Sequence, residues 1–355
     1  MLVIEARYYV NWVAHTRFEV HKEESEIAMS TRRIIIDTDG GADDAVAIMM
    51  ALRHPDIQVE AITTVADNVT VDQATINVLY VLEYCGEAGI PVYKGRHQAL
   101  IRRAADPDRL HGKSVFGSDG LGDIEREAPS LIARPEHACH AIIEQIMSQP
   151  DEISIVALGP LSNIALSVLI EPRIVEKVQH IYMMGGVVNA LGNVSPSAES
   201  NVWADPEAAE IVLQAEPPIT MIGWELVWGE MLITAKEMER FRRSGSRMAK
   251  LAMDCSYKVA EVVERLVGEP GLPLPDAIAM ATVIDPSICK TRYLYVAVET
   301  RSDLTRGETV VDEWGILSQR PNVNVCFEPD AQKYKKLLYD LLLPEISTKS
   351  AVDIM

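Results

Sequence analysis

The sequence contains few cysteines, and they are not arranged as a disulfide framework. None belongs to a C-x-x-C pair, and an odd number leaves one without a partner. The five are widely separated along the chain: Cys85, Cys139, Cys255, Cys289 and Cys326. This spacing excludes a small disulfide-stapled scaffold and fits best a reducing cytoplasm.

Basic charge and long apolar runs are also scarce. The formal net charge is -19, and no block of Lys and Arg is interleaved with aromatic residues, so nucleic acid is a poor candidate partner. The acidity is compatible with binding of a divalent cation. No stretch reaches the roughly 18 apolar residues of a membrane span, so we expect no membrane partner.

Residues 1–28 are predicted to be an appendage, either disordered or included through an upstream start codon. Glu5 and Arg7 interrupt its apolar residues, so it lacks the uninterrupted core of a signal peptide. Met29 directly precedes the first clear strand. With 48% hydrophobic residues the chain can bury a substantial core, and we expect a single domain over residues 29–355.

From residue 32 onward, β-branched runs alternate with helical patterns. Strands are expected at RIIID, VEAITTV, PVYKG, ISIVALG, HIYMMGG, PITMIG and RYLYVAVET. Helices are expected near residues 43–53, 72–88 and 135–148, as a pair over 235–267, and from Asp276. This alternation predicts α/β architecture with an open, mainly parallel, Rossmann-like sheet flanked by helices. The polar, Gly-rich stretch 102–128 interrupts the pattern, as functional loops do.

Four aspartates follow directly on the apolar run that opens the predicted sheet. Alternation along a strand places Asp37 and Asp39 on one side near its carboxyl end, and Asp43 and Asp44 begin the next helix. All four should meet at the carboxyl edge of the sheet, where open α/β folds bind ligands. Nearby carboxylates repel unless a cation neutralises them, so the cluster indicates Ca²⁺ or Mg²⁺.

Other interpretations explain only part of this cluster. Asp43 or Asp44 alone would serve as a helix N-cap, but that leaves Asp37 and Asp39 unexplained. An EF-hand is excluded because a strand precedes the cluster and the required Gly and Glu spacing is missing. A haloacid-dehalogenase-like phosphatase also opens with a strand and D-x-D, but it would need a downstream lysine and a late acidic motif, for which GSDGLGD is too loose.

Further segments make the sequence resemble the inosine-uridine nucleoside hydrolase family. DTDGGADDAVAI is similar to the family signature D-x-D-x-G-x-D-D-x-x-A, and the other segments follow in the family's order: AITTVADNV, LHGKS, VALGPLSNIAL, MMGG, GNVSPSAESNVWADPEAA and PDAIAMATVIDP. The resemblance covers about residues 32–330. It implies the nucleoside hydrolase fold and Ca²⁺-dependent hydrolysis of ribonucleosides to ribose and free base, in purine or pyrimidine salvage, by a cytoplasmic homodimer or homotetramer.

The resemblance also implies a role for each matching residue. Asp39, Asp44, Asp276 and the backbone carbonyl of Leu158 match the Ca²⁺ ligands. Asp39 also matches the general base that takes a proton from the attacking water, and Asp37 matches a supporting acidic position. Six residues match groups around the ribose: Asp43, Asn68, Met184, Asn193, Glu199 and Asn201. Taken singly, some of these have plainer explanations as a strand end, core filler or a turn residue.

The resemblance breaks at Pro275. Family members carry there a histidine that protonates the leaving base or a tryptophan that stacks on it, and proline does neither. We expect His111 to protonate the base, or an aromatic side chain to stack on it. The aromatic candidates are Trp203, Trp224 and Tyr257. Each has an ordinary alternative, loop hydrogen bonding for His111 and core packing for the aromatic residues.

Two alternative functions follow from Pro275. One is a nucleoside-binding relative with reduced catalysis, and the other is a hydrolase of a modified riboside whose leaving group needs no proton. The intact Asp39, Asp44 and Asp276 argue against the first. Asp67 is a second departure, since relatives usually carry a small residue there, and it is expected to face solvent rather than add charge near the metal.

Overall fold

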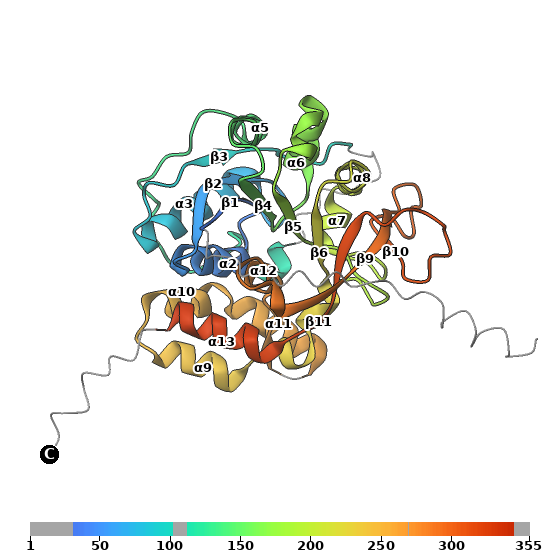
Figure 1. Cartoon of the computed structure of the whole chain (residues 1–355). Coiled ribbons are helices and arrows are strands. Elements are labelled where there is room, and N and C mark those ends of the chain that lie inside the picture. Colours follow the sequence, from blue (N-terminus) through green and yellow to red (C-terminus); the bar gives the residue numbers. More distant parts are fainter. Residues whose placement is uncertain (1–30, 102–111, 269, 344–355) are drawn as a thin grey trace, which may run out of the picture. The chain divides into compact units, whose positions relative to one another are not determined.

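A mixed, mostly parallel sheet forms the centre of the fold. The structure is a computed structural model that describes residues 31–101, 112–268 and 270–343. The parallel strands are β1 (Arg32–Thr38), β2 (Ile57–Thr64), β3 (Val92–Lys94), β4 (Ile153–Ala157), β5 (His180–Met184), β6 (Ile219–Ile222) and β11 (Val323–Pro329). Strands β9 (Cys289–Val298) and β10 (Thr309–Asp312) are antiparallel. Within the described residues these nine strands have the order β10-β9-β11-β6-β5-β4-β1-β2-β3 (Figure 1). The predicted fold class is confirmed.

Strand β1 lies in the middle of the parallel part. Its apolar residues are buried on both faces, because Ile34 and Ile36 pack into one hydrophobic cluster and Ile35 into the other. A buried parallel strand therefore reads as a continuous apolar run. The strand order reverses between β1 and β4, and such a switch point opens a crevice at the carboxyl ends of the strands. The aspartate cluster follows β1 at this point.

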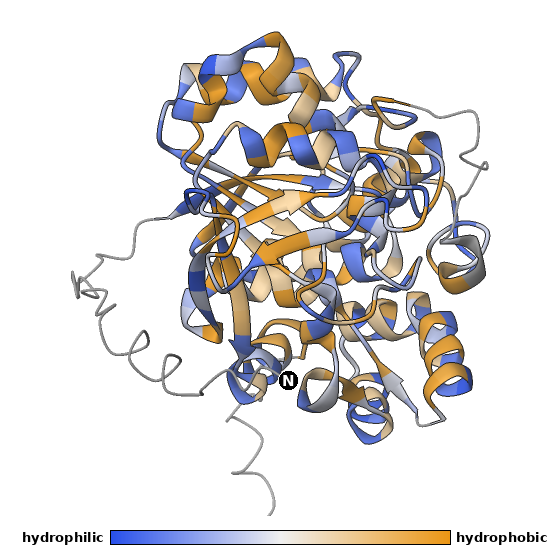
Figure 2. Cartoon of the chain, turned by 90° about the vertical axis from the view of Figure 1, so that its right-hand side faces the viewer, coloured by the Kyte–Doolittle hydropathy of each residue, from blue (hydrophilic) through white to orange (hydrophobic). Residues whose placement is uncertain are grey.

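The helices belong to the same two hydrophobic clusters, one on each face of the sheet. The first contains α2 (Ala42–Arg53), α3 (Val71–Cys85), α9 (Ala235–Arg243), α10 (Arg247–Cys255), α11 (Tyr257–Val267), α12 (Pro275–Ile284) and α13 (Ala331–Leu342). The second contains α5 (Ala138–Ser148), α6 (Ser162–Ile170) and α8 (Pro206–Gln214). Figure 2 shows the strands as largely hydrophobic and most outer helices as two-sided. The sheet is thus covered on both faces, as a parallel sheet requires.

Shorter elements connect these layers. They are α4 (Lys113–Phe116), α7 (Ser200–Ala204), the small hairpin of β7 (Ile233–Thr234) and β8 (Gly271–Leu272), and the 3-10 turns η1 (Pro172–Glu176), η2 (Trp224–Val227), η3 (Gly229–Met231) and η4 (Pro286–Ile288). Two of them, α7 and η2, begin at the carboxyl edge of the sheet and contribute to the site described below.

The region 235–267 differs from the predicted helix pair, because it forms the three helices α9, α10 and α11. Gly245 has a φ of 76°, which ends the first helical stretch. The Ser246 hydroxyl then accepts a hydrogen bond from the Ala249 amide (3.2 Å) and caps α10. A second break lies at Ser256. The amphipathic pattern continues across both breaks, so periodicity alone did not reveal them.

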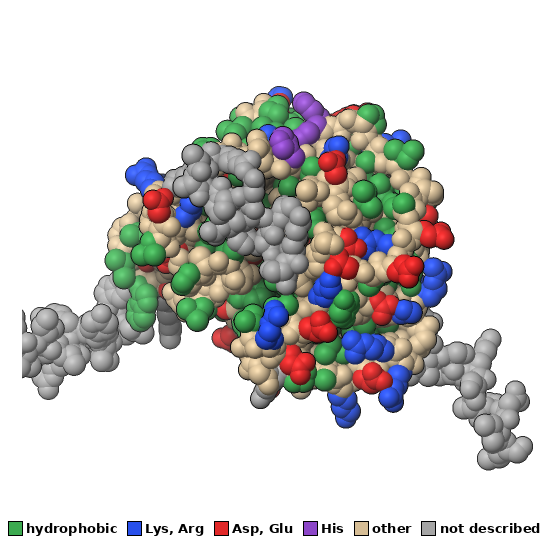
Figure 3. All heavy atoms as spheres, turned by 180° about the vertical axis from the view of Figure 1, so that it is seen from behind, with side chains coloured by type: hydrophobic (Ala, Val, Ile, Leu, Met, Phe, Trp, Pro, Cys, Tyr) green, Lys and Arg blue, Asp and Glu red, His purple; other side chains and the backbone are tan. Residues whose placement is uncertain are grey.

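The cysteines, the helices and the charged surface each bear on an expectation from the sequence. All five cysteines are free. Among the described helices, none is both long and apolar enough to cross a membrane. On the face shown in Figure 3, Lys and Arg are mixed with Asp and Glu, without a continuous basic area outside the grey atoms. The predicted appendage over residues 1–28 and the candidate acid His111 lie outside the described residues.

Candidate active site

The turn between β1 and α2 brings the aspartates together. Thr38 Oγ1 donates to one oxygen of Asp44, and the Gly41 amide donates to the other (2.8 Å), so Asp44 closes the first turn of α2. Gly40 has a φ of 72°, and a Cβ there would lie 2.7 Å from Ala74 Cα. Only glycine fits this turn, which folds the start of α2 back over the end of β1.

Asp37 and Asp39 have different surroundings. Asp37 is fully buried, and its Oδ1 accepts hydrogen bonds from Thr63 Oγ1 (2.5 Å) and Asn163 Nδ2 (2.8 Å). Asp39 Oδ2 accepts a hydrogen bond from the Asn68 amide (3.0 Å), whereas its buried Oδ1 has no protein partner. Each of the two carboxylates thus has one buried oxygen without a protein partner, Oδ2 in Asp37 and Oδ1 in Asp39. The difference lies in the other oxygen, which two side chains hold in Asp37 and one backbone amide holds in Asp39.

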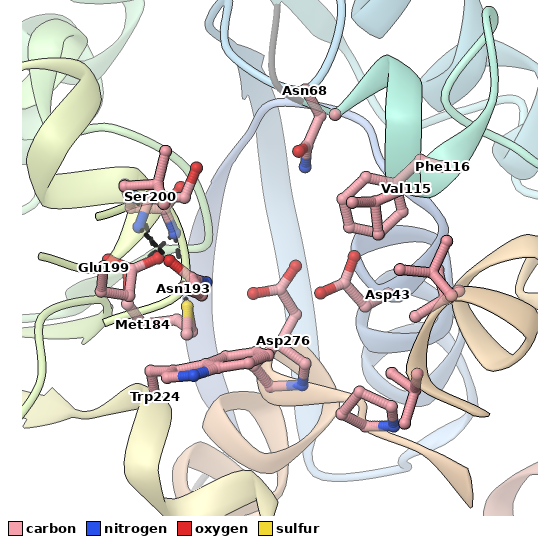
Figure 4. A pocket seen from close by; sticks show the side chains of 18 of the residues that line it. Asp43, Asn68, Val115, Phe116, Met184, Asn193, Glu199, Ser200, Trp224 and Asp276 are labelled. Atoms are coloured by element: carbon pink, nitrogen blue, oxygen red, sulfur yellow. Dashed lines mark hydrogen bonds between the residues drawn. The ribbon is translucent and has the colours of Figure 1, made fainter. Parts of the chain in front are cut away.

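Asp276, far away in the sequence, joins the cluster from the first turn of α12. Carboxylate oxygens of Asp43, Asp44 and Asp276 lie within 4.8 Å of one another. Asp39 is not part of this trio, but the charge of Asp44 is among the causes that raise the pKa of Asp39. Figure 4 shows Asp43 and Asp276 facing each other at the centre of the pocket. Four buried carboxylates from β1, α2 and α12 thus form one group.

Burial makes this group costly in its ionised form. Desolvation and the neighbouring carboxylates raise the pKa of Asp39 and of Asp276 well above the usual range, and raise that of Asp43 to about 8. The N-termini of α2 and α12 offset only part of this cost. No described residue lining the adjoining cavity is Lys, Arg or His. Because Asp39 Oδ1 and Asp43 Oδ1 also lack partners, the cluster suits a hard metal cation.

The cluster forms the floor of a cavity of about 480 Å³. Many of the predicted site residues line it: Asp43, Asn68, Leu158, Met184, Asn193, Glu199, Asn201, Trp224 and Asp276. They follow β1, β2, β4, β5 and β6 or begin α7 and α12, so the carboxyl edge of the sheet gathers them. Asp39 and Asp44, 1% and 0% exposed, lie behind this lining.

One wall of the cavity is polar and tightly organised. Glu199 caps α7, and its two oxygens accept hydrogen bonds from the amides of Asn201 (2.9 Å) and Gly186 (2.9 Å). Asn201 Nδ2 donates to the carbonyls of Leu158 (2.8 Å) and Met184 (3.1 Å). The Leu158 carbonyl has a second lone pair and can accept a further ligand.

The opposite wall is apolar. Trp224 and Trp228 meet edge to face with ring centroids 5.4 Å apart. The wall is completed by Val115 and Phe116 of α4, by Pro273 and Pro275, and by one side of α11, Val259, Val262, Val263, Leu266 and Val267. Such a surface can hold a planar heterocycle by stacking and apolar contact.

Most residues of this apolar wall were not predicted from the sequence, and two of the predicted aromatic residues, Trp203 and Tyr257, do not line it. Trp203 packs against Gly307 instead. Tyr257 is 37% exposed, and Lys258 lies over its ring. Trp228 directly follows the 3-10 turn η2 in an extended conformation, so no helical spacing in the sequence indicated that it would lie beside Trp224.

The expectation that Asp67 faces solvent is wrong. It is 7% exposed and accepts a hydrogen bond from Ser200 Oγ (3.1 Å), and the Ser200 amide donates to Asn193 Oδ1 (2.9 Å). Burial raises the pKa of Asp67 to about 8, and nearby Glu199 adds to this effect. Asp67 therefore adds a further carboxyl group beside the polar wall.

The chain is similar to nucleoside hydrolases in both sequence and structure. The profile of the family described as inosine-uridine preferring nucleoside hydrolase matches residues 34–336. A pyrimidine-specific ribonucleoside hydrolase, RihB, of Escherichia coli is 36% identical over 320 residues, or 90% of this chain and 100% of RihB. A plant nucleoside hydrolase, PpNRh1, has a TM-score of 0.83 at 32% identity over 88% of this chain and 100% of that one. The purine-preferring ribonucleoside hydrolase from Gardnerella vaginalis has a TM-score of 0.81 at 27% identity over 88% and 98%.

Proposed function

This chain belongs to the inosine-uridine preferring nucleoside hydrolase family, and we propose that it hydrolyses ribonucleosides to ribose and free base with Ca²⁺ at its aspartate cluster. The observation that carries this proposal is the position of the cluster. Buried carboxylates that need a cation lie at the floor of a cavity with one polar and one apolar wall. A ribose fits the polar wall, and a heterocyclic base fits the apolar one.

Four groups would hold the ion: the carboxylates of Asp39, Asp44 and Asp276 and the carbonyl of Leu158. Asp43 lies beside them and has a buried oxygen without a partner. This oxygen would offset part of the charge of the ion or accept a hydrogen bond from a ribose hydroxyl. Carboxylate and carbonyl oxygens are the ligands that Ca²⁺ prefers. When bound, the ion offsets the carboxylate charge and lowers the pKa of water in contact with it.

The residues of the site have separate roles in the reaction, proton transfer and ribose binding. Asp39 takes a proton from the water whose oxygen attacks C1′ of the ribose. The C1′–N bond breaks, and its electron pair stays with the base. Asn68, Asn193 and Asn201 hold the ribose hydroxyls, and Glu199 fixes the start of α7 from which Asn201 projects. Binding energy from the ribose is thereby used for orientation.

A substrate panel tests this function. Free ribose should be released from one or more of inosine, adenosine, guanosine, uridine, cytidine and nicotinamide riboside. Treatment with a chelator should abolish release, and added Ca²⁺ should restore it more fully than Mg²⁺. Binding of these ribosides without any ribose release, at saturating Ca²⁺, would instead favour a nucleoside-binding protein.

We propose His111 as the acid that protonates the departing base, because Pro275 lines the cavity without a proton to give. His111→Ala should lower kcat on neutral nucleosides by about 10²-fold and flatten the high-pH limb of the kcat profile. Nicotinamide riboside, whose base leaves as a neutral molecule, is the internal control and should be affected little. Unchanged turnover on every nucleoside would remove His111 from the mechanism.

Trp224 and Trp228 are proposed to contact the base. Trp228→Ala should raise KM about 10-fold with kcat changed less, because loss of base–aromatic stacking costs roughly 1–3 kcal/mol. Trp314→Ala is a matched control, since this residue is 71% exposed and does not line the cavity. Equal KM values for the two variants would contradict a stacking role for Trp228.

We also propose that the enzyme serves purine or pyrimidine salvage in the cytoplasm as a homodimer or homotetramer. Free cysteines and the family resemblance support this proposal. Light scattering coupled to size-exclusion chromatography would test the assembly, and a purely monomeric protein at micromolar concentration would contradict it.

A further inference from the structure

The loop between β5 and α7, residues 185–199, is held at its start by four consecutive amides. Each donates to a different part of the chain: Gly185 to the Ile222 carbonyl (3.1 Å), Gly186 to Glu199 Oε2 (2.9 Å), Val187 to Thr309 Oγ1 (2.9 Å) and Val188 to Glu225 Oε2 (3.0 Å). This loop contributes Asn193 and Glu199 to the cavity lining. Its conformation therefore determines where the polar wall lies.

Thr309 on β10 makes an unusual contact with this loop. Its hydroxyl accepts from the Val187 amide and donates to the Val187 carbonyl (2.7 Å), so both polar backbone groups of one residue are satisfied by one side chain. Thr309 is 5% exposed and is paired in the sheet with Val298. The contact is tight, because a Cβ on Gly186 would lie 2.8 Å from Thr309 Cγ2.

A short chain of bonds connects this contact to the cavity. Gly186, next to Val187, donates to Glu199, and Glu199 in turn accepts from the Asn201 amide. Asn201 donates to the Leu158 carbonyl. A shift of Val187 would move the Gly186 amide away from Glu199 and release the start of α7. Thr309 itself is not among the residues that line the cavity.

A second contact, between Asn189 of the loop and Glu313, lies close in sequence to the first. Asn189 Nδ2 donates to Glu313, which follows β10, and Glu313 forms an ion pair with Arg292 of β9 (2.6 Å). The β9–β10 hairpin and the residue after it thus contact the loop at two points, Val187 and Asn189. The antiparallel extension of the sheet is placed to support the polar wall (Figure 1).

We propose that Thr309 is a positioning residue for the substrate, which holds the 185–199 loop so that Asn193 and Asn201 meet the ribose. The inference rests on the proposed function in taking ribose as the ligand of the polar wall. It assigns to the β9–β10 hairpin a role in substrate recognition in addition to its place in the sheet. Of the four groups proposed to hold the ion, only the Leu158 carbonyl is reached by this chain of bonds.

Thr309→Val tests the proposal, because it keeps the shape of the side chain and removes both hydrogen bonds. We expect kcat/KM for ribonucleosides to fall by about 10- to 100-fold, as misplacement of a positioning group does. Discrimination against analogues that lack one ribose hydroxyl should shrink by a similar factor. Thr309→Ser keeps the hydroxyl and should restore most of both. Ca²⁺ affinity, measured by calorimetry, should change far less than kcat/KM in either variant, because three of the four proposed ligands are carboxylates outside this chain of bonds.

Thr220→Val provides the matched control. Thr220 is also a buried strand threonine, 7% exposed, whose hydroxyl is hydrogen-bonded to His180 (2.9 Å) outside the cavity lining. The Thr220→Val protein should be less stable than the wild type but should discriminate equally well against analogues that lack a ribose hydroxyl. If Thr309→Val lowers the melting temperature but leaves KM and discrimination as they are in Thr220→Val, Thr309 is merely structural and the proposal is overturned.

Hydrogen–deuterium exchange separates this inference from the proposed function. Amides of residues 185–202 should exchange faster in Thr309→Val than in the wild type or Thr309→Ser, whether or not the protein hydrolyses nucleosides. If Thr309→Val exchanges faster and the wild type releases no ribose, the loop contact is retained and the hydrolase function is rejected. Unchanged exchange in this segment would reject the contact itself.

Discussion

Asp39→Asn should lower kcat on the best ribonucleoside by about 10³- to 10⁴-fold, the upper range for loss of a general base. The amide has nearly the same shape and can still accept from the Asn68 amide, but it cannot take a proton from water. The free Oδ1 of Asp39 is the group that changes. Ribose release should be measured at saturating Ca²⁺, because the substitution also removes one charge from the proposed cation site.

Asp37→Asn is the matched control for this substitution. Asp37 is equally buried and also has one oxygen without a partner, but its Oδ1 is held by two side chains, Thr63 and Asn163, whereas Asp39 accepts only from the Asn68 amide. An asparagine keeps an acceptor there, so kcat should fall by less than about 10-fold. Nucleoside affinity, measured by calorimetry on the inactive Asp39→Asn protein, should stay near the wild-type KM. A loss in Asp37→Asn as large as that in Asp39→Asn would contradict the assignment of the base.

The sequence predicted the parallel half of the fold well, because its central strands are buried on both faces and give continuous apolar runs. The run before Asp37 and the run ISIVALG are examples, and they are β1 and β4. The C-terminal part was predicted poorly. Residues 323–329 mix buried, partly buried and exposed positions without a regular period, so they give no clear strand pattern. Helix α13 did have a signal that the prediction passed over, because Asp330 caps it and Tyr334, Leu338, Leu341 and Leu342 recur at helical spacing.

The polar half of the site was also predictable, because its residues follow directly on strands or begin helices. The carboxyl edge of a parallel sheet must bring such positions together. The apolar wall was not predictable in the same way, since Val259 and Val263 of α11 look like ordinary core positions in a helical pattern. Which side of a buried helix faces a cavity depends on tertiary packing. Thr309 was missed for a similar reason, because nothing in the sequence of β10 points to a loop 122 residues earlier.

Removal of the metal should make stability fall as pH rises, which is unusual for an acidic protein. In the ion-free site, burial raises the pKa of Asp37 to about 7 and those of Asp43 and Asp67 to about 8, and it raises those of Asp39 and Asp276 well above their usual range. Unfolded aspartate has a pKa of about 3.9. The folded protein therefore binds more protons than the unfolded chain above pH 4, so the free energy of unfolding decreases with pH until these groups ionise.

The range from pH 6.5 to 8.5 isolates this effect. Buried His180, whose pKa is lowered to about 4 by desolvation, has the opposite sign, but most of its contribution is reached by pH 6.5 and the rest by about pH 7.5, where the unfolded-state imidazole has lost its proton. For each pH unit over which the folded protein holds one more proton than the unfolded chain, the free energy of unfolding falls by about 1.4 kcal/mol. Several such groups should lower the melting temperature by on the order of 10 °C across the range.

Thermal unfolding of chelator-treated protein at pH 6.5 and 8.5, with and without Ca²⁺, measures this difference. Asp43→Asn should weaken the pH dependence, whereas Asp340→Asn, an exposed member of an ion pair with Lys336, should leave it unchanged. Ca²⁺ at about 1,000 times its Kd should add roughly 4 kcal/mol, and more at pH 8.5 than at pH 6.5 because the ion competes with protons for the carboxylates. A metal-free protein that is more stable at pH 8.5 would mean that the cluster is neutralised by something other than protons or a cation.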